Sequence, residues 1–234
     1  MGLLVILTGC PETAKEAKNI EPKGMVNFTF FNTVSYVYCY ADNTNEVFEE
    51  RCNAVWDILK EYHQLFDIYY EYSGVTNLMT LNKNAGGEAM VVDQKLIDFL
   101  LYAKELYEQT GGEMNVMMGS VLKIWHDART AGTYVPDMDK LTAAKALTDI
   151  SLLEIDEENN TVRIAKAGAS LDVGALGKGY ATEKAAAKAE GENLIHILLD
   201  NTIISSAAAR ERIDSTECIL QGGFTAQEAA TIAN

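Results

Sequence analysis

A regular hydrophobic pattern runs through residues 48–66, where apolar side chains recur at the spacing of one helix face. Asn43, followed by Glu46 three positions later, has the form of a helix-capping signal. Together they predict a long amphipathic helix that buries one face. His63 falls on this helix, and we interpret it as a surface or core histidine rather than as a metal ligand.

The segments on either side of this helix have different compositions. Residues 26–40 are rich in Phe, Tyr, Val and Thr and predict one or two strands, with Asn32 as a bend. Residues 67–87 are typical of a loop that contains at most one short turn. A second helix is expected to open at residues 91–93 and to end at the glycines 111 and 112.

The second half of the chain predicts shorter elements. In order, we expect a helical segment at residues 121–125, a helix at 139–147, a hairpin of 152–155 with 161–164, strands at 195–199 and 202–204, and a last helix capped by Thr225 and Glu228. A third strand is expected to follow the hairpin and to run into a glycine-containing loop.

That loop occupies residues 171–180 and is followed by an alanine-rich helical run. Its glycines, at 174, 177 and 179, are expected to allow positive φ values and a close approach to a ligand. The helix N-terminus behind them favours an anion, and Lys178 adds a full positive charge. Asp172 can accept hydrogen bonds from a ring N–H or a hydroxyl. The loop therefore suits a nucleotide-like ligand.

The spacing excludes two better-known phosphate loops. Gly179 is followed by Tyr180 and Ala181, whereas a Walker A loop needs a lysine and then a serine or threonine directly after its last glycine. The order of the glycines also differs from that of a dinucleotide-binding fold. The alternative is an ordinary strand-to-helix turn that binds no ligand.

Composition narrows the class of partner. The chain has 34 acidic and 19 basic residues and a formal net charge of -15, which argues against a nucleic acid or an anionic membrane surface as its main partner. Its four cysteines include no C-x-x-C pair and its three histidines are scattered, so the sequence does not indicate a structural zinc site.

The N-terminus has the features of a lipoprotein signal. A short apolar run leads to Leu7-Thr8-Gly9-Cys10, which resembles a bacterial lipobox, and the polar residues 11–24 look like a tether. The run is too short to span a bilayer, so we interpret residues 1–24 as the remnant of a signal and tether. We expect an exported protein, anchored to the cell membrane by a lipid on Cys10.

Three motifs in order resemble those of the ApbE family of FAD:protein FMN transferases. They are Phe66-Asp67-Ile68-Tyr69 with Leu81-Asn82; Thr110-Gly111-Gly112-Glu113-Met114-Asn115 with Met118-Gly119-Ser120-Val121 and Ile124-Trp125-His126; and Leu171-Asp172-Val173-Gly174-Ala175 with Gly177-Lys178-Gly179-Tyr180-Ala181. The resemblance covers residues 25–190 and implies an α+β fold, an ApbE-like α/β sandwich related to the T-fold.

The resemblance also implies a reaction. FAD would be the substrate, a Thr or Ser hydroxyl of an acceptor flavoprotein would attack the phosphorus next to FMN, and AMP would be released with the help of Mg²⁺. By position in the motifs it assigns flavin contacts to Glu113, Met114, Asn115, Asp172 and Lys178, ligand packing to Phe31 and Tyr69, and a Mg²⁺-binding carbonyl to Ala175. It assigns no catalytic residue.

The last segment differs from this family. Residues 196–234 look like a piece of the SecD protein-export subunit, so we expect 191–234 to be a foreign or divergent strand-helix tail on a sandwich truncated at its C-terminus. The family's later motifs, which complete its metal site, are not found here. The alternatives to a transferase are a non-catalytic flavin-binding remnant and an export-linked interaction protein.

Overall fold

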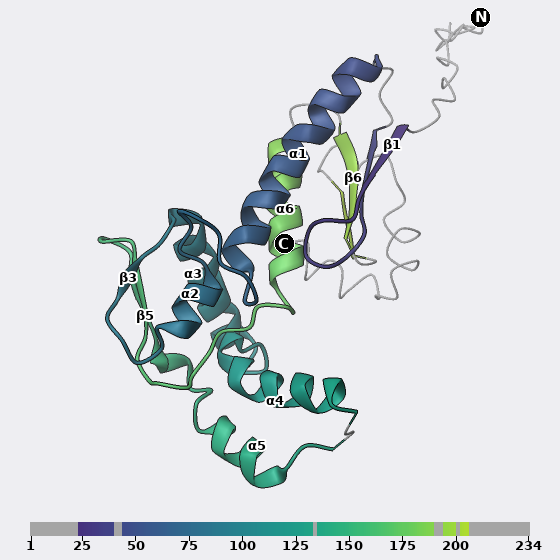
Figure 1. Ribbon diagram of the computed structural model, residues 1–234. Coiled ribbons are helices and arrows are strands. Elements are labelled where there is room, and N and C mark those ends of the chain that lie inside the picture. The colour runs from purple at the N-terminus through teal and green to yellow at the C-terminus, as the bar shows by residue number, and fades with distance from the viewer. Residues whose placement is uncertain (1–22, 40–43, 133–134, 190–193, 200–201, 206–234) are drawn as a thin grey trace, which may run out of the picture.

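The computed structural model describes residues 23–39, 44–132, 135–189, 194–199 and 202–205. The strands form two sheets, and the helices pack between and around these sheets, as expected for an α+β fold (Figure 1). One sheet has four strands in the order β1-β2-β6-β7, and the other has three in the order β3-β5-β4. All neighbouring strands are antiparallel.

The four-stranded sheet joins the two ends of the described chain. Its strands are β1 (Lys23–Asn27), β2 (Ser35–Cys39), β6 (Leu194–Leu199) and β7 (Thr202–Ser205). β2 pairs with β6 in a register that places Val37 opposite Ile197. The predicted strands at 26–40, 195–199 and 202–204 are confirmed, and Asn32 lies in the turn between the first two. The expected helix at Thr225 lies outside the described residues.

The long helix α1 (Asn45–Phe66) forms as the hydrophobic pattern predicts. Thr44 is its N-cap and accepts a hydrogen bond from the Val47 N–H. Its buried side chains follow helical spacing, and they are Phe48, Cys52, Val55, Trp56, Leu59, Tyr62, Leu65 and Phe66. α1 packs along α6 (Gly177–Ala189), which also contacts β6 and β7 (Figure 1). The two helices thereby form a layer beside the four-stranded sheet.

The second sheet corrects two predictions. β4 (Leu153–Asp156) and β5 (Thr161–Ile164) form the expected hairpin, but its third strand is β3 (Met90–Val91) rather than the segment that enters the glycine loop. The second helix, α3 (Gln94–Gln109), consequently starts three residues later than expected, after Asp93 caps it. Residues 165–176 contain no strand, and within them the Asn82 side chain binds the backbone N–H and carbonyl of Leu171.

The segment at 67–87 also contains more structure than predicted. The helix α2 (Leu78–Lys83) forms there, and its N-terminus is a capping box in which Asn77 and Thr80 bind each other's backbone. Asn77 is fully buried and its amide donates to the carbonyls of Gln64 and Tyr70. The apolar Leu78 and Leu81 turn into the core.

The remaining helices include α4 and α5, which lie at the bottom of the view, away from the four-stranded sheet (Figure 1). They are η1 (Val116–Met118), α4 (Gly119–Thr130), α5 (Met138–Lys145) and η2 (Ile150–Leu152). α4 is longer than the predicted helical segment at 121–125, and α5 agrees with the helix predicted at 139–147. In the part of the chain that the structure describes, no helix is long and apolar enough to cross a bilayer.

Candidate functional site

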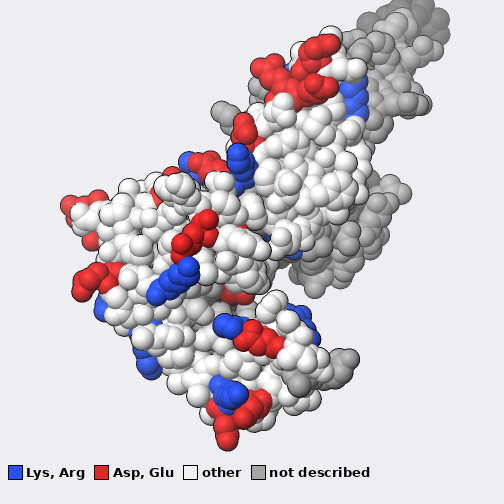
Figure 2. Space-filling view, in the orientation of Figure 1, with Lys and Arg blue, Asp and Glu red and all other residues white. Residues whose placement is uncertain are grey.

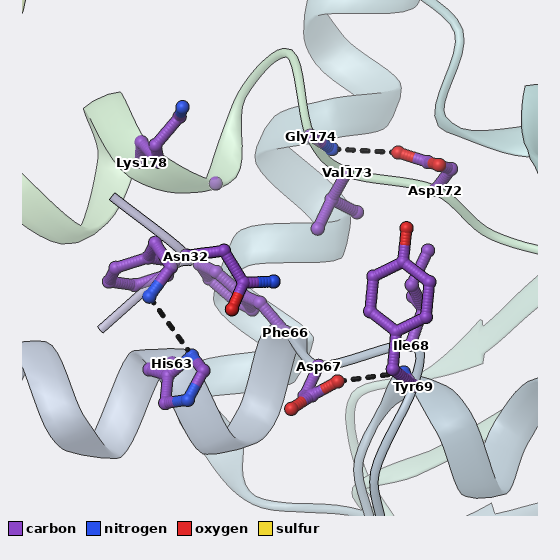
Figure 3. A pocket seen from close by; sticks show the side chains of 12 residues that line it. Asn32, His63, Phe66, Asp67, Ile68, Tyr69, Asp172, Val173, Gly174 and Lys178 are labelled. Atoms are coloured by element: carbon purple, nitrogen blue, oxygen red, sulfur yellow. Dashed lines mark hydrogen bonds between the residues drawn. The ribbon is translucent and has the colours of Figure 1, made fainter. Parts of the chain in front are cut away.

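A pocket of about 290 Å³ lies where the turn after β1, the end of α1 and the glycine loop meet (Figure 3). Its walls come from three parts of the sequence, and the lining residues are Phe31, Asn32, His63, Phe66, Asp67, Ile68, Tyr69, Asp172, Val173, Gly174, Gly177 and Lys178. The volume is at the lower end of the range of about 300 to 1,000 Å³ for small-molecule sites.

The first wall is the turn at Phe31 and Asn32. Both residues have positive φ values, 55° and 51°, which a phenylalanine rarely adopts. The Phe31 N–H donates to His63 Nδ1 at 3.2 Å, and the Phe31 ring stands edge-on to the imidazole with centroids 5.5 Å apart. The turn is therefore held by a specific contact with α1.

The second wall follows the end of α1. Asp67 is buried, and its Oδ1 accepts hydrogen bonds from the N–H groups of Tyr69 and Tyr70 at 2.7 and 3.0 Å. Its Oδ2 accepts a bond from the Tyr72 hydroxyl at 2.8 Å. These bonds orient Tyr69, whose half-exposed ring extends toward the loop that carries Val173 and Asp172 (Figure 3).

The third wall is the glycine loop, and its backbone differs from the prediction. Gly174, Gly177 and Gly179 do not have positive φ values, and Gly177 and Gly179 belong to the first turn of α6. At Gly177 the absent side chain matters for packing instead, because a Cβ there would lie 3.0 Å from the Phe66 ring. The loop still presents the N-terminal end of a helix to the pocket.

The backbone of the glycine loop is held by hydrogen bonds to Asn82 and Val116 rather than by pairing with a neighbouring strand. The Asn82 side chain accepts from the Leu171 N–H at 2.7 Å and donates to the Leu171 carbonyl at 2.9 Å. The Asp172 N–H donates to the Val116 carbonyl at 2.9 Å. Because these groups occupy the backbone, the predicted strand end at residue 171 does not form.

Gly119 allows the closest approach in this region. Its N–H donates to the Ser170 carbonyl at 3.1 Å, and a Cβ at this position would lie 2.6 Å from the Ser170 carbonyl oxygen. No L side chain fits there without a backbone shift. The Met118-Gly119-Ser120 motif thus packs directly against the chain that leads to Asp172.

Four of the sequence-predicted site residues line the pocket together. Phe31, Tyr69, Asp172 and Lys178 come from segments up to 147 positions apart and meet at one cavity. Asp172 Oδ1 accepts from the Gly174 N–H at 2.9 Å, and Lys178 stands in the first turn of α6 (Figure 3). With Asp67, which also lines it, the pocket combines aromatic surface, two carboxylates and a lysine.

The other predicted residues lie outside the pocket lining. Glu113 is exposed, and Met114 donates its N–H to Thr110 Oγ1 at 3.0 Å. The Asn115 amide is engaged at both atoms, since Oδ1 accepts from the Met117 N–H and Nδ2 donates to the Thr148 carbonyl. Ala175 is exposed between Gly174 and the helix. Their assignment to ligand binding stays a prediction.

Three polar lining residues, Asn32, His63 and Asp67, are not among the site residues predicted from the sequence. Asp67 belongs to the motif Phe66-Asp67-Ile68-Tyr69, and its position two and three residues before the N–H groups it binds is the spacing of an Asx turn. For Asn32 the sequence predicts only a bend. For His63 it predicts a surface or core position, and no pattern in the sequence shows that its ring meets the Phe31 backbone.

Charge is distributed unevenly over the molecule. Figure 2 shows acidic side chains gathered at the N-terminal end of α1, with Lys and Arg scattered among acidic residues elsewhere on that face. Within the described ranges, no group of three or more His, Cys, Asp or Glu side chains could hold a metal ion. In an acidic chain, Lys178 is a local basic feature of the pocket.

Comparison with solved structures relates this fold to known proteins. The ApbE protein of Thermotoga maritima matches with a TM-score of 0.69 and 20% identity, over 79% of this chain and 59% of that one. The flavin transferase ApbE of Vibrio cholerae matches with a TM-score of 0.61 and 16% identity, over 76% and 57%. These similarities confirm the predicted ApbE-like fold.

Sequence comparison gives the same relationship. An FAD:protein FMN transferase of Treponema pallidum (strain Nichols) is 33% identical over 112 residues, which cover 46% of this chain and 31% of that protein. One of Klebsiella pneumoniae (strain 342) is 27% identical over 136 residues, or 58% and 42%. The matched regions thus span about a third to two fifths of these curated relatives.

The sequence profile of the ApbE family matches residues 31–202. The match includes all three pocket walls and continues through β6 to the first residue of β7. The division at residues 24/25 and 190/191 and the SecD-like origin of the tail stay predictions. On the profile, the sequence similarities and the fold, the chain belongs to the ApbE family.

Proposed function

We propose that this chain acts in the transfer of FMN from FAD to a Thr or Ser hydroxyl of an acceptor flavoprotein, with release of AMP. The observation that supports this most directly is the meeting of Phe31, Tyr69, Asp172 and Lys178 around one pocket. Two aromatic rings suit the faces and edges of a flavin. A carboxylate can accept from a ring N–H, and a lysine can neutralise phosphate.

The proposed reaction balances without an external oxidant or reductant. The acceptor hydroxyl oxygen forms a bond to the FMN phosphorus, the bond from that phosphorus to the bridging oxygen breaks, and AMP leaves with the bridging oxygen. The hydroxyl proton is released. In such a transfer the protein contributes mainly positioning and neutralisation of charge. Lys178 would stabilise the negative charge that develops on the leaving AMP.

Mg²⁺ dependence is part of the proposal, with the Ala175 carbonyl as one ligand. The described residues fit only a partial site, since no cluster of three suitable side chains accompanies this carbonyl. Mg²⁺ commonly completes its octahedral shell with water and substrate phosphates. The remaining ligands would have to come from those sources, from residues outside the described ranges or from a second chain.

The test is AMP release from FAD by the purified protein, with Mg²⁺ and with excess EDTA. The proposal predicts release that EDTA reduces by at least about tenfold, because without a cation the negative charge that develops on the leaving AMP is not neutralised. FAD binding without AMP release in either condition would favour the alternative of a non-catalytic flavin-binding remnant. Co-purification of translocation components without FAD binding would favour an export-linked interaction protein.

We further propose that the protein is exported and held at the membrane by a lipid on Cys10, which lies outside the described residues. The support is the lipobox-like Leu7-Thr8-Gly9-Cys10 in the sequence. In bacterial cells fed a labelled fatty acid, the wild-type protein should carry the label and a Cys10→Ser variant should not. Equal labelling of both would contradict the anchor.

A further inference from the structure

His63 connects two walls of the pocket through a continuous chain of hydrogen bonds. On one side its Nδ1 accepts the Phe31 N–H at 3.2 Å, and on the other its Nε2 lies 3.3 Å from the Tyr72 hydroxyl oxygen. Tyr72 in turn donates to Asp67 at 2.8 Å, and Asp67 binds the Tyr69 N–H. This series of hydrogen bonds therefore connects the wall at Phe31 with the wall at Tyr69.

The geometry fixes which nitrogen of His63 carries the proton. An atom that accepts a hydrogen bond from a backbone N–H must present a lone pair, so Nδ1 is unprotonated. The ring proton of the neutral imidazole then lies on Nε2, facing the Tyr72 oxygen. Tyr72 can use its own proton for the bond to Asp67. Every hydrogen bond in this series thus has one defined donor and one defined acceptor.

The Phe31–Asn32 turn needs this anchor. Phe31 and Asn32 are two successive non-glycine residues with positive φ, 55° and 51°, and such strained conformations persist only where the surroundings hold them. The hydrogen bond and the edge-on ring contact with His63 join this turn to the rigid helix α1. Removing the acceptor would leave the turn free to relax away from the pocket.

The charged form of His63 is incompatible with this arrangement. A proton on Nδ1 would face the Phe31 N–H, placing two donors against each other. Burial lowers the pKa of His63, opposed by the nearby carboxylate of Asp67. Burial, followed by the hydrogen bond to Asp67, raises the pKa of Tyr72 to about 12, so Tyr72 stays neutral. Across the pocket the charged groups are Asp172 and Lys178.

We propose that His63 is a positioning residue for the flavin pocket: its neutral Nδ1 holds the Phe31–Asn32 turn in place, and protonation of the ring releases the turn and weakens ligand binding. This inference rests on the proposed function only in taking FAD as the ligand. The direction of the pH dependence follows from the hydrogen bond that the Phe31 N–H donates to His63 Nδ1. FAD binding is strongest where His63 is neutral, and it falls as the pH drops through the lowered pKa of His63.

Two substitutions separate the hydrogen bond from the titration. His63→Asn places an amide oxygen close to the position of Nδ1 and cannot be protonated in this range, whereas His63→Leu keeps apolar volume but has no acceptor. His126→Asn is the matched control, because His126 is an exposed histidine whose ring lies 6.2 Å from that of Tyr69. Among the described residues, no hydrogen bond joins His126 to Phe31.

The experiment is an FAD titration of each variant between about pH 5 and pH 8, the range in which histidine titrates. We expect FAD affinity to fall about tenfold toward low pH in the wild type and in His126→Asn, to be independent of pH in His63→Asn, and to be weak throughout in His63→Leu. A pH dependence that survives in His63→Asn, or wild-type affinity in His63→Leu, would overturn the proposal.

A second measurement does not depend on FAD. In protein labelled with ¹⁵N-phenylalanine, the Phe31 amide resonance should shift with pH in the wild type and stay fixed in His63→Asn. If FAD does not bind while this resonance titrates, the proposed function fails and the anchor stands. If the resonance does not titrate, the anchor is wrong whatever FAD does.

Discussion

Replacing Lys178 with alanine should slow AMP release from FAD by about 100-fold, the loss typical of removing one group that stabilises a developing charge. Lys178 lines the pocket in the first turn of α6, where its charge adds to that of the helix N-terminus. The FAD dissociation constant should change much less than the rate, because the flavin contacts of Phe31, Tyr69 and Asp172 are retained. Both quantities are measured on the same preparation.

Lys184→Ala is the matched control for this prediction. Lys184 lies on the same helix but packs over the Tyr180 ring, with Nζ 4.9 Å from the ring centroid, and it does not line the pocket. Its removal changes the net charge equally and should leave the rate of AMP release within about twofold. The role of Lys178 is wrong if both variants release AMP at the wild-type rate while still binding FAD.

Gly119→Ala should destabilise the fold by about 3 kcal/mol, near the upper end for an overpacked position. The added Cβ would lie 2.6 Å from the Ser170 carbonyl oxygen and 2.9 Å from the Leu171 carbonyl carbon, and backbone atoms cannot move aside as a side-chain end can. The strain should also displace the segment that leads to Asp172, so FAD affinity should fall. Urea unfolding, with FAD titration of the folded variant, measures both effects.

Gly179→Ala provides the comparison. Gly179 lies in α6, a Cβ there would meet nothing within 4 Å, and its φ is not positive. Alanine has a higher helix propensity than glycine, so this variant should be as stable as the wild type or more stable by about 0.5 to 1 kcal/mol. If the two alanine variants unfold alike, the close contact at Gly119 does not constrain the fold as described.

The elements that the sequence predicted well are those whose signal is local. The apolar period of residues 48–66 produces α1, and the hairpin of β4 and β5 forms between matching strand patterns. Where predictions failed, a distant group decided the outcome. Asn82 binds the backbone of Leu171, 89 positions away, and this contact replaces the expected strand with a loop held by a side chain.

The glycine loop shows a similar limit. Its residues predicted an anion-binding turn with positive φ, whereas Gly177 serves the packing of Phe66 and the positive-φ glycines lie elsewhere, as at Gly111 and Gly112. The sequence shows where the glycines are, but it does not show whether each one serves a positive φ or a close packing contact. At Gly177 the reason for glycine is the nearby Phe66 ring, which is far away in the sequence and so is not part of the local pattern.

The candidate site was predicted in part. The family resemblance identified Phe31, Tyr69, Asp172 and Lys178, which the fold brings to one pocket. It could not identify His63 and Asp67 as the groups that hold two of the walls, because their partners are backbone N–H groups, and any residue type supplies those. Such contacts become visible only once the chain is folded.

FMN transfer at this pocket can be measured by following both products of one reaction. Purified protein, FAD, Mg²⁺ and a Thr-containing acceptor domain are incubated together, and AMP and acceptor-bound flavin are quantified over time. If the pocket serves FMN transfer, the two products appear in equal amounts and Lys178→Ala slows the formation of both. AMP without flavin on the acceptor, or neither product from protein that binds FAD, would contradict it.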